Sequence, residues 1–480
     1  MNRELPTLFS ERMKTMLQDE YERFVDCFSN QTYLGLRVNT CKTTPDELRG
    51  EIRLLEPVPW CSETGFYYPE EERPGKHPYH AAGLYYLQEP SAMSAAVVLE
   101  AQPGETVLDL CAAPGGKSTQ LAVAMNNRGL LISNEIHPVR VKALSENIER
   151  LGITNTIVTN ETPERLAERF PLFFDRILVD APCSGEGMFR KLPEAIDDWS
   201  PAKVTECHIM QKDILDSAAD MLKPGGVLVY STCTFAPLEN EQSISEFLQK
   251  HPEFELEPIP TAEFFLPGVP EWGDPTFNLK LTSRLWPHHL HGEGHYVAKL
   301  RKKDLTALDE DDDSLSAAPA SKKAGKKKSG QTQVNAGRKE AIAAWRQFAE
   351  EAVPSVLERT ADDKAYQLFG EHLYYSPASS LELSGLKVAR PGWHLGTVKK
   401  NRFEPSHALA LAIGPDEATR VHQMDLAEGT AVYDYLEGQT LQADGSNGWT
   451  LVTVNGYPLG WGKQSNGQLK NHYPKGLRWV

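Results

Sequence analysis

The chain has 480 residues, of which 40% are hydrophobic and 24% are charged, a composition typical of a globular protein with about two to four domains. We find no run of about 18 apolar residues that could span a membrane, and the N-terminal segment lacks the apolar core of a secretory signal. The net charge of −16 argues against binding of nucleic acid over the whole surface.

The seven cysteines lie at scattered positions, and no two of them form a Cys-x-x-Cys pair. An odd number without that spacing argues against a disulfide framework and against a zinc site. We therefore expect a cytoplasmic protein that binds no metal and no membrane.

The first 80 residues predict a small α+β subdomain. A helical segment opens the chain, and the strand-like run LGLRVNT precedes a second helical segment, TPDELRGEI. From Gly104 to Leu300, strand-like apolar runs then alternate with helical segments. This alternation indicates right-handed crossovers and a mostly parallel sheet, and we assign residues 81–303 to this α/β domain. Ligands of such sheets bind at the carboxyl ends of the strands.

The remaining residues predict a linker and a second domain. Residues 304–338 hold an acidic block, an Ala/Pro/Ser stretch and a lysine block, and such a segment is typically disordered. Residues 339–480 begin with a helical segment and continue in short strand-like runs separated by glycine turns, which favours a small β-rich module. From residue 445 to the end there is no Asp or Glu, so a basic face in this region is compatible with the acidic total.

The segment VLDLCAAPGGKS (107–118) is similar to a phosphate-binding loop but departs from it. Its Gly-Lys-Ser fits the end of G-x-x-x-x-G-K-[ST], but Cys111 stands where the first glycine is required. What remains is a strand, a turn of small residues and a helix N-terminus. The next strand ends at Glu135, and a carboxylate there suits a ribose. This pattern favours an adenosyl ligand over NAD or ATP, and the alternative is that Glu135 only caps the following helix.

Two further cysteines, Cys183 and Cys233, each follow a strand-like run, in DAPCSGEGMF and VYSTCTFAPLENE. Carbon 5 of a pyrimidine is a poor nucleophile, and an enzyme can activate it by adding a thiolate to carbon 6. That chemistry needs a cysteine at a strand end, beside the methyl donor. A lone cysteine would be interpreted as a buried apolar residue, but two in polar surroundings favour catalysis. Spacing alone does not choose between them.

Three motifs, DLCAAPGGKS, DAPCSGEG and YSTCTFAPLENE, occur in this order. With LGLRVNT, GLYYLQEPSAM and RLWPHHLHGEGHYVAKL, they resemble the NOL/NOP/Sun family of S-adenosylmethionine-dependent RNA cytosine-5 methyltransferases. RFEPSHALALAI and LKNHYPKGLRW resemble the RNA-binding tail of bacterial RsmF-type enzymes, which act on 16S rRNA. The resemblance implies an α/β fold: a Rossmann-like class I methyltransferase domain, a small N-terminal α+β subdomain and a C-terminal β-rich, PUA-like RNA-binding region.

The resemblance also implies roles for individual residues. Cys233 is the implied nucleophile, Cys183 assists release of the methylated product, and Asp180 lies near the methyl group and the base. The residues implied to bind S-adenosyl-L-methionine are Cys111, Ala112, Ala113, Pro114, Gly115, Gly116, Lys117, Glu135, Arg140 and Asp180.

One position departs from the family pattern. Thr162 stands where the family has the third-strand acid that contacts the adenine, so Asn160, Glu161 or a backbone amide would take its place. The predicted RNA contacts are Arg37, Asn39, Arg190, Lys191, Lys463 and Lys470.

The implied reaction makes 5-methylcytosine in structured RNA, and the tail favours 16S rRNA or the small ribosomal subunit as partner of a monomeric enzyme. The target base must leave its stack to reach such a site. The same reaction on tRNA is one alternative, and an RNA-binding ribosome-assembly factor without activity is another.

Overall fold

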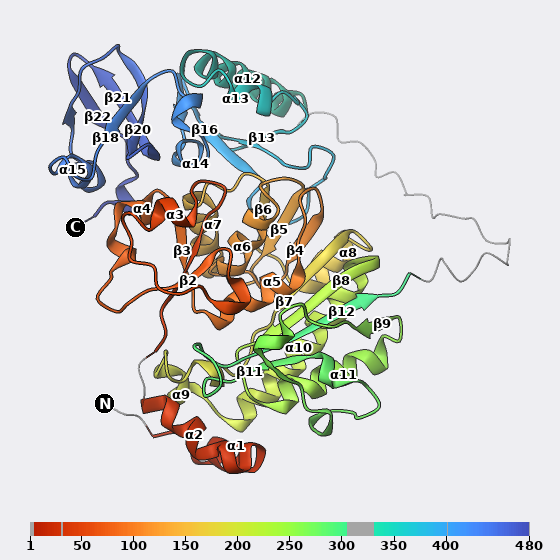
Figure 1. The fold of residues 1–480 in the computed structure, drawn as a ribbon. Helices are drawn as coiled ribbons and strands as arrows, with labels where there is room; N and C mark the ends of the chain where they lie inside the picture. Colours follow the sequence, from red (N-terminus) through yellow and green to blue (C-terminus); the bar gives the residue numbers. More distant parts are fainter. Residues whose placement is uncertain (1–3, 30–31, 305–330, 401, 480) are drawn as a thin grey trace. The chain divides into compact units, whose positions relative to one another are not determined.

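The computed structural model describes residues 4–29, 32–304, 331–400 and 402–479, and the chain forms two compact units, whose elements are labelled in Figure 1. The first unit consists of Met1–Leu151, Ile157–Lys303 and Gly385–Ala389. The second consists of Gly152–Thr156, Asp304–Ser384 and Arg390–Val480. Most of the predicted linker, residues 304–338, lies outside the described residues.

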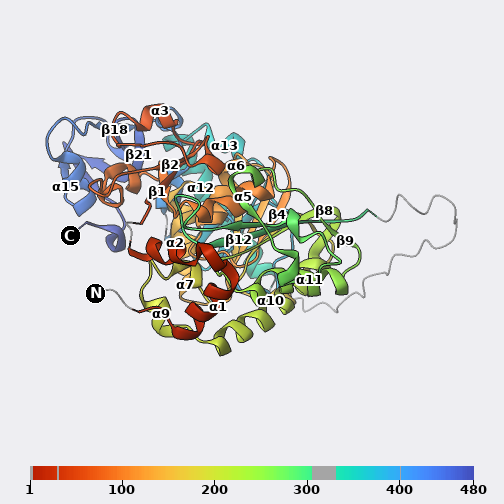
Figure 2. The ribbon, with the colours of Figure 1, turned by 60° about the horizontal axis from the view of Figure 1, so that its bottom comes forward.

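Two helices, α1 (Thr7–Leu17) and α2 (Tyr21–Asp26), open the first unit. Figures 1 and 2 both show them beside the short helix α9 (Glu194–Asp198). A cluster of buried apolar side chains packs these helices against the rest of the unit. Its members are Phe9, Met13, Phe24, Phe189, Phe235 and Trp286. Burial of about 150–250 Å² by each aromatic side chain makes such a cluster a strong attachment.

A three-stranded antiparallel sheet follows, in which β1 (Gly35–Val38) lies between β2 (Gly65–Tyr67) and β3 (Tyr85–Leu87). Helix α3 (Pro45–Leu48) begins with a capping box. The N-terminal α+β arrangement is as predicted. Strand β3 lies beyond residue 80, so the sheet continues past the boundary that the sequence suggested.

The centre of the first unit is a ten-stranded sheet in the order β10-β11-β12-β8-β7-β4-β5-β6-β15, with β9 paired to β12. The last of these strands, β15, is Val388–Arg390. Strand β4 is parallel to β5 and β7, and β7 is parallel to β8. The central strands are β4 (Thr106–Asp109), β5 (Leu130–Asn134), β6 (Thr156–Thr159), β7 (Phe174–Asp180) and β8 (Leu222–Thr232). The alternation of the sequence therefore predicted this part of the fold.

Helices connect these strands, and their bounds are α5 (Ser94–Leu99), α6 (Gly116–Ala124), α7 (Arg140–Arg150), α8 (Pro163–Arg169), α10 (Pro201–Met221) and α11 (Glu241–Lys250). Helix α7 illustrates the spacing of apolar residues from which these helices could be predicted. Its buried residues Val141, Leu144 and Ile148 recur at spacings of three and four, which places them on one face of a helix.

Four strands that the alternation did not predict complete the sheet: β9 (Phe254–Leu256), β10 (Leu266–Pro267), β11 (Ser283–Leu285) and β12 (His295–Lys302). Strand β12 is antiparallel to β8, β9 and β11. The expected parallel sheet is thus parallel at its centre and antiparallel at this edge, because three of these strands are too short to show a clear period.

The second unit is β-rich, as predicted. Helix α12 (Gln331–Ala352) precedes a four-stranded sheet of β13 (Tyr366–Phe369), β14 (His372–Tyr375), β16 (Trp393–Lys399) and β17 (Arg402–Pro405). A five-stranded sheet has the order β18 (Val421–Met424), β20 (Gly448–Val454), β21 (Tyr457–Ser465), β22 (Gln468–Asn471) and β19 (Leu441–Gln442). Trp345, Trp393 and Trp461 belong to one hydrophobic core of this second unit. No helix among the described residues is long and apolar enough to cross a membrane.

A buried ion pair joins the antiparallel edge of the main sheet to α11. Arg284 on β11 donates from Nε to Glu241 Oε1 at 2.7 Å and from Nη2 to Glu241 Oε2, and both side chains are at most 2% exposed. Arg284 Nη1 also donates to the carbonyl of Phe235, at 3.0 Å. Removing one partner of such a pair would leave the other charge buried without compensation, which strongly destabilises a protein.

Replacing Glu241 by alanine is expected to lower the free energy of unfolding by about 3–5 kcal/mol, because Arg284 would stay buried without its counter-charge. Urea unfolding monitored by circular dichroism measures this difference. Glu246→Ala is the matched control on the same helix, since Glu246 pairs with Lys212 at the surface and its loss should cost less than about 1 kcal/mol. Equal losses in the two variants would contradict the argument.

Candidate functional site

The carboxyl ends of the central strands surround a cavity of about 590 Å³. Its lining comes from the loops after β4, β5, β6, β7 and β8 and from helix α10. The lining residues include Cys111, Ala113, Glu135, Arg140, Thr162, Asp180, Cys183 and Cys233. The first unit therefore brings together most of the residues that the sequence assigned to the cofactor and to catalysis.

The loop after β4 turns sharply into helix α6. Gly115 has a φ of 110°, a conformation that favours glycine, and an added Cβ would lie 3.1 Å from a Leu144 side-chain carbon. Helix α7 holds this loop from the side, because Arg140 donates to the Ala113 carbonyl at 2.7 Å and Asn147 donates to the Pro114 carbonyl at 2.9 Å. A second cavity, of about 190 Å³, lies against the same loop and is lined by Ala112, Gly116 and Lys117 among others.

Glu135 follows β5 and is only 3% exposed. One carboxylate oxygen accepts from the backbone N–H of His137 at 2.8 Å, and the other lies 3.4 Å from Arg140 Nη1. Glu135 therefore caps the turn into α7 and also lines the larger cavity, so the two interpretations of this residue are compatible.

Asp180 at the end of β7 is the charged centre of the site. Its carboxylate lies 2.7 Å from Lys117 Nζ and accepts from Ser231 Oγ at 2.8 Å. Burial lowers the pKa of Lys117, but the negative charge of Asp180 outweighs burial and raises it. Nearby Asp109 is fully buried and accepts from Ser118 Oγ at 2.6 Å, and burial raises the pKa of Asp109 to about 7.

The two cysteines of interest meet in the site. Cys183 Sγ and Cys233 Sγ lie 3.1 Å apart, and the backbone N–H of Cys233 donates to Cys183 Sγ at 3.3 Å. The hydrogen bond with Cys233 and burial together raise the pKa of Cys183 well above its usual value. Cys183 therefore remains a protonated thiol at neutral pH, directly beside the second sulfur.

A second layer of polar groups fixes the Cys183 loop. Glu239 accepts from the backbone N–H of Ser184 at 2.8 Å and also from the Ser184 hydroxyl. Ser184 Oγ lies 2.9 Å from Thr234 Oγ1, on the loop that carries Cys233. Burial raises the pKa of Glu239 to about 7.

Known proteins that are similar to this chain identify its family. Family models match four successive parts of the chain: the N-terminal domain of 16S rRNA methyltransferase RsmF at residues 5–90, 16S rRNA methyltransferase RsmB/F at 96–301, the first C-terminal domain of RsmF rRNA methyltransferase at 347–413, and the methyltransferase RsmF PUA domain at 427–479.

Relatives match over almost the full length. Ribosomal RNA small subunit methyltransferase F of Shewanella amazonensis is 33% identical over 92% of this chain and 91% of its own, and that of Vibrio vulnificus strain YJ016 is 32% identical over 98% and 97%. The chain belongs to the RsmF family of 16S rRNA methyltransferases. A solved methyltransferase homolog protein from Pyrococcus horikoshii is 31% identical, with a TM-score of 0.54, over 62% of this chain and 95% of that one.

Membership of the RsmF family makes the chain an rRNA methyltransferase with a PUA domain, and it removes the alternative of a protein without activity. It also gives the β-rich second unit its place as the C-terminal domains of such an enzyme.

The structure corrects two of the RNA contacts that the sequence suggested in this RsmF-family chain. Arg37 is 2% exposed and donates to Thr119 Oγ1 at 2.8 Å and to the Gly116 carbonyl at 2.9 Å. Asn39 is 1% exposed and donates to two backbone carbonyls. Arg37 thus holds β1 against the start of helix α6, whereas Asn39 joins the end of β1 to Gly83 and Leu151. Neither side chain is exposed to contact RNA.

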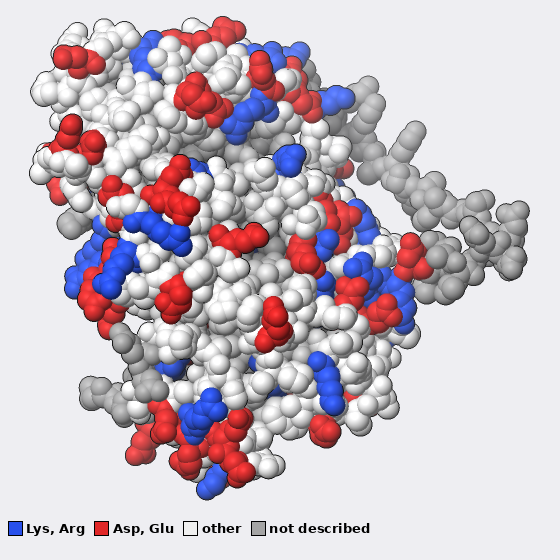
Figure 3. All heavy atoms as spheres, in the orientation of Figure 1, with Lys and Arg blue, Asp and Glu red and all other residues white. Residues whose placement is uncertain are grey.

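The other RNA candidates differ in exposure. The Arg190 side chain is 5% exposed and pairs with Glu293 at 3.1 Å, so it too is engaged within the protein. Lys191, Lys463 and Lys470 are exposed. Figure 3 shows basic and acidic side chains interspersed on the face that it draws, which is consistent with binding through local groups of cations rather than a uniformly basic surface.

Which residue would contact the adenine of the cofactor in this RsmF-family chain stays a prediction. Thr162 lines the larger cavity and caps α8 by accepting from the backbone N–H of Arg165. Asn160 donates to the carbonyls of Glu135 and Ile136, and Glu161 accepts from the backbone N–H of Lys387. Of the three, Thr162 is the one that lines the cavity.

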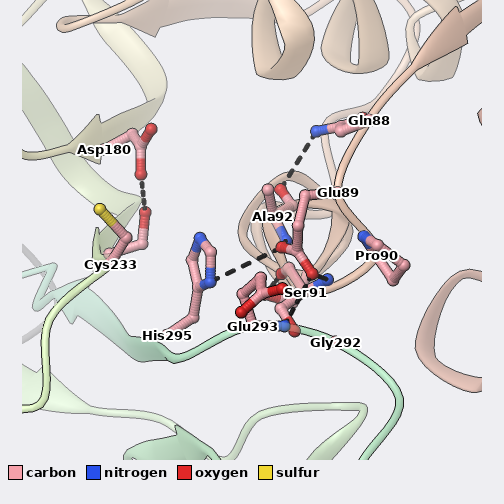
Figure 4. A network of polar contacts seen from close by, with 12 residues as sticks. Gln88, Glu89, Pro90, Ser91, Ala92, Asp180, Cys233, Gly292, Glu293 and His295 are labelled. Atoms are coloured by element: carbon pink, nitrogen blue, oxygen red, sulfur yellow. Dashed lines mark hydrogen bonds and ion pairs between the residues drawn. The ribbon is translucent and has the colours of Figure 1, made fainter. Parts of the chain in front are cut away.

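The sequence missed His295, which starts β12. Continuing the β8–β12 register by one residue places it opposite Cys233, and residues opposite each other in antiparallel strands share a face of the sheet. Figure 4 shows its ring between the Asp180–Cys233 side and Glu89, whose Oε2 lies 3.8 Å from His295 Nδ1. A histidine opening a strand-like run was the available signal, but β12 itself was not predicted.

Glu239 should make the stability of this RsmF-family enzyme depend on pH. Because its pKa is raised to about 7 from 4.5, the folded state keeps the proton that the unfolded chain releases, and this contribution is present below pH 4.5 and is lost as the pH rises through 7. Between these two pH values the original chain should lose on the order of 3 kcal/mol of unfolding free energy through Glu239. The Glu239→Gln variant should not show this loss.

Urea unfolding at pH 5 and pH 8 measures this effect. Glu246→Gln, which changes a half-exposed carboxylate on the adjoining helix α11, should keep the pH dependence of the original chain. If Glu239→Gln loses as much stability between the two pH values as the original chain, Glu239 is not protonated in the folded state.

Proposed function

We propose that the chain transfers a methyl group from S-adenosyl-L-methionine to carbon 5 of a cytosine in 16S rRNA, through a covalent bond between Cys233 and carbon 6. The observation that carries this proposal is the pair of thiols 3.1 Å apart at the ends of β7 and β8, beside the Asp180–Lys117 pair and a cavity of about 590 Å³.

The larger cavity fits an adenosyl cofactor, which would supply the activated methyl group. Its polar lining includes the buried carboxylate of Glu135, which can accept hydrogen bonds from ribose hydroxyls, and Thr162 near the predicted adenine position. From the loop Cys111 to Lys117, Cys111 and Ala113 line the larger cavity, and Ala112, Gly116 and Lys117 line the smaller one beside it. The small side chains of this loop let a ligand approach its backbone. Arg140 acts on this loop by holding the Ala113 carbonyl.

The nucleophilic step explains why a sulfur is needed. As the sulfur of Cys233 bonds to carbon 6, the electrons of the carbon 5–carbon 6 double bond make carbon 5 nucleophilic enough to take the methyl group. Asp180 lies at the same strand edge as this thiol, and a carboxylate suits the exocyclic amine of cytosine, which donates hydrogen bonds. The base would have to leave its stack to be held there.

The release step gives Cys183 a role distinct from that of Cys233. A water molecule takes the carbon 5 proton, the electrons of that carbon–hydrogen bond re-form the carbon 5–carbon 6 double bond, and the carbon 6–sulfur bond breaks with its electrons leaving on Cys233 as a thiolate. Cys183 is held protonated beside Cys233, so it can donate a hydrogen bond to the departing sulfur and stabilise its charge.

We assign RNA binding to the residues that flank this centre. The N-terminal residues 1–80 and the C-terminal residues 339–480 are proposed to hold the rRNA, and residues 304–338 to link the two. The exposed lysines Lys191, Lys463 and Lys470 are proposed to contact phosphates, because phosphate contacts dominate the affinity of proteins for structured RNA.

A Cys183→Ala variant incubated with 16S rRNA and S-adenosylmethionine is expected to accumulate a covalent RNA–protein species, since attack is possible but release is slowed. The double variant Cys183→Ala/Cys233→Ala should form none. Denaturing gel electrophoresis before and after ribonuclease treatment detects the species, and tRNA in place of 16S rRNA should give none.

Cys207→Ala is the matched control, because Cys207 is a buried cysteine that does not line the cavity; it should form 5-methylcytosine like the original chain, measured by bisulfite sequencing of the rRNA. An adduct that persists in the double variant would exclude Cys233 as the nucleophile. If 16S rRNA that has reacted with the original chain contains no bisulfite-resistant cytosine, 5-methylcytosine is excluded as the product.

The cofactor assignment is tested at Glu135. Glu135→Ala should weaken the binding of S-adenosylmethionine about 10- to 100-fold, as expected for loss of hydrogen bonds to a charged group. Isothermal titration calorimetry without RNA measures it. Glu164→Ala changes another acid that lines the same cavity and should leave the affinity nearly unchanged, whereas equal effects in both variants would contradict a ribose contact at Glu135.

A further inference from the structure

Glu20, His288 and His289 form a cluster on the N-terminal side of the first unit, away from the thiols. Glu20 ends the 3₁₀ turn Gln18–Glu20 between α1 and α2, and the two histidines follow β11 in the segment that leads to β12. One atom of each residue lies within 4.8 Å of the others. Two parts of the chain that are about 270 residues apart thus present three ligand-type side chains to one point.

The distances suit a tetrahedral metal ion. Glu20 Oε2 lies 3.5 Å from His288 Nε2 and 3.2 Å from His289 Nε2. Two ligands bound at about 2.0–2.1 Å with a tetrahedral angle between them are about 3.4 Å apart. The two distances from Glu20 are therefore close to those that an ion would impose, and the two histidine nitrogens lie within 4.8 Å of each other.

His288 supplies an independent indication of a missing partner. Its side chain is 0% exposed, and neither ring nitrogen has a hydrogen-bond partner among the described residues. Buried polar groups are normally satisfied, and an exception calls for a water or an ion. Nε2 lies 3.5 Å from the Glu20 carboxylate, so this ring nitrogen is directed into the cluster.

The surroundings hold the His288 ring in place. It packs edge-on against the rings of Phe24 and Trp286, at 5.6 Å and 5.7 Å between ring centres. Arg23 donates to the His288 carbonyl at 2.6 Å, which fixes the backbone. An ion would meet a site whose most buried ligand is already oriented, and this lowers the entropic cost of binding.

We propose that Glu20, His288 and His289 bind a divalent transition-metal ion, for which zinc is the best match. Two imidazoles and one carboxylate are the ligand types that zinc accepts with a fourth position left to water. This proposal departs from the expectation that the protein binds no metal, which rested on the spacing of the cysteines. That spacing cannot reveal two histidines and a glutamate that meet only after folding.

The ion would fasten the N-terminal helices to the segment that enters β12. That segment contains Glu293, which pairs with Arg190, and Gly294, whose N–H donates to the Gly187 carbonyl at 3.2 Å. The N–H of Gly187 in turn donates to the Cys233 carbonyl at 2.9 Å. The metal would therefore act as a structural clamp on the segment whose Gly294, a few residues beyond His289, is linked by two hydrogen bonds through Gly187 to Cys233.

The test uses the full chain, freed of metal with a chelator and then titrated with zinc chloride or cobalt chloride. Zinc should raise the melting temperature of the original chain and of His291→Gln, a control in the same loop whose ring stacks on Tyr33. It should not raise that of Glu20→Gln or His289→Gln, both at partly exposed positions where the substitution leaves the fold intact, as circular dichroism of the metal-free variants checks.

Cobalt gives a second readout that separates this site from the thiols. The difference spectrum between the original chain and Glu20→Gln should show visible bands of tetrahedral cobalt and no sulfur-to-cobalt charge-transfer band in the near ultraviolet. Equal melting shifts in all four proteins, no shift in the original chain, or a difference spectrum with the sulfur band would overturn the proposal. None of these outcomes depends on methyl transfer.

Discussion

The parallel pairing of β7 with β8 is the constraint on which the site depends. The register sets Asp180 opposite Ser231, and both strands leave the sheet within two residues of that point. Because parallel strands end at the same edge, the loops that follow must begin side by side. The 3.1 Å contact between Cys183 and Cys233 is a direct result, although 50 residues separate the two along the chain.

Polar groups behind the two loops turn this proximity into a defined geometry. Glu239 holds the Ser184 backbone, and the Tyr230 hydroxyl donates to the Glu239 carbonyl at 2.6 Å. Asn240 accepts from Thr232 Oγ1 at 2.6 Å and donates to the Thr234 carbonyl at 3.0 Å. A network in which every member is satisfied is rigid in the low dielectric of the interior, so the sulfur of the proposed nucleophile Cys233 is positioned by the fold itself.

Much of this arrangement could be predicted from the sequence, because it depends on local signals. Alternating strand and helix patterns gave the order of the central elements, and the residues just after strands gave the candidates at Cys111, Glu135, Asp180, Cys183 and Cys233. The burial of Arg37 and Asn39 could not be predicted, since their partners lie from 44 to 112 residues away. His295 was missed for the same reason, because its position beside Cys233 comes from the antiparallel pairing of β12 with β8, which joins residues distant along the chain.

The ion pair between Arg284 and Glu241 has a consequence for the speed of the reaction. Through Nη1, Arg284 also holds the Phe235 carbonyl, two residues past Cys233, while Thr232 is held on the other side by Asn240. The loop with the proposed nucleophile is therefore restrained at both flanks before any RNA binds. Its conformational entropy is lost during folding rather than on the way to the transition state, and a group already in place gains the rate advantage of an intramolecular reaction. A buried ion pair outside the cavity thus limits the conformations that the proposed nucleophile must sample.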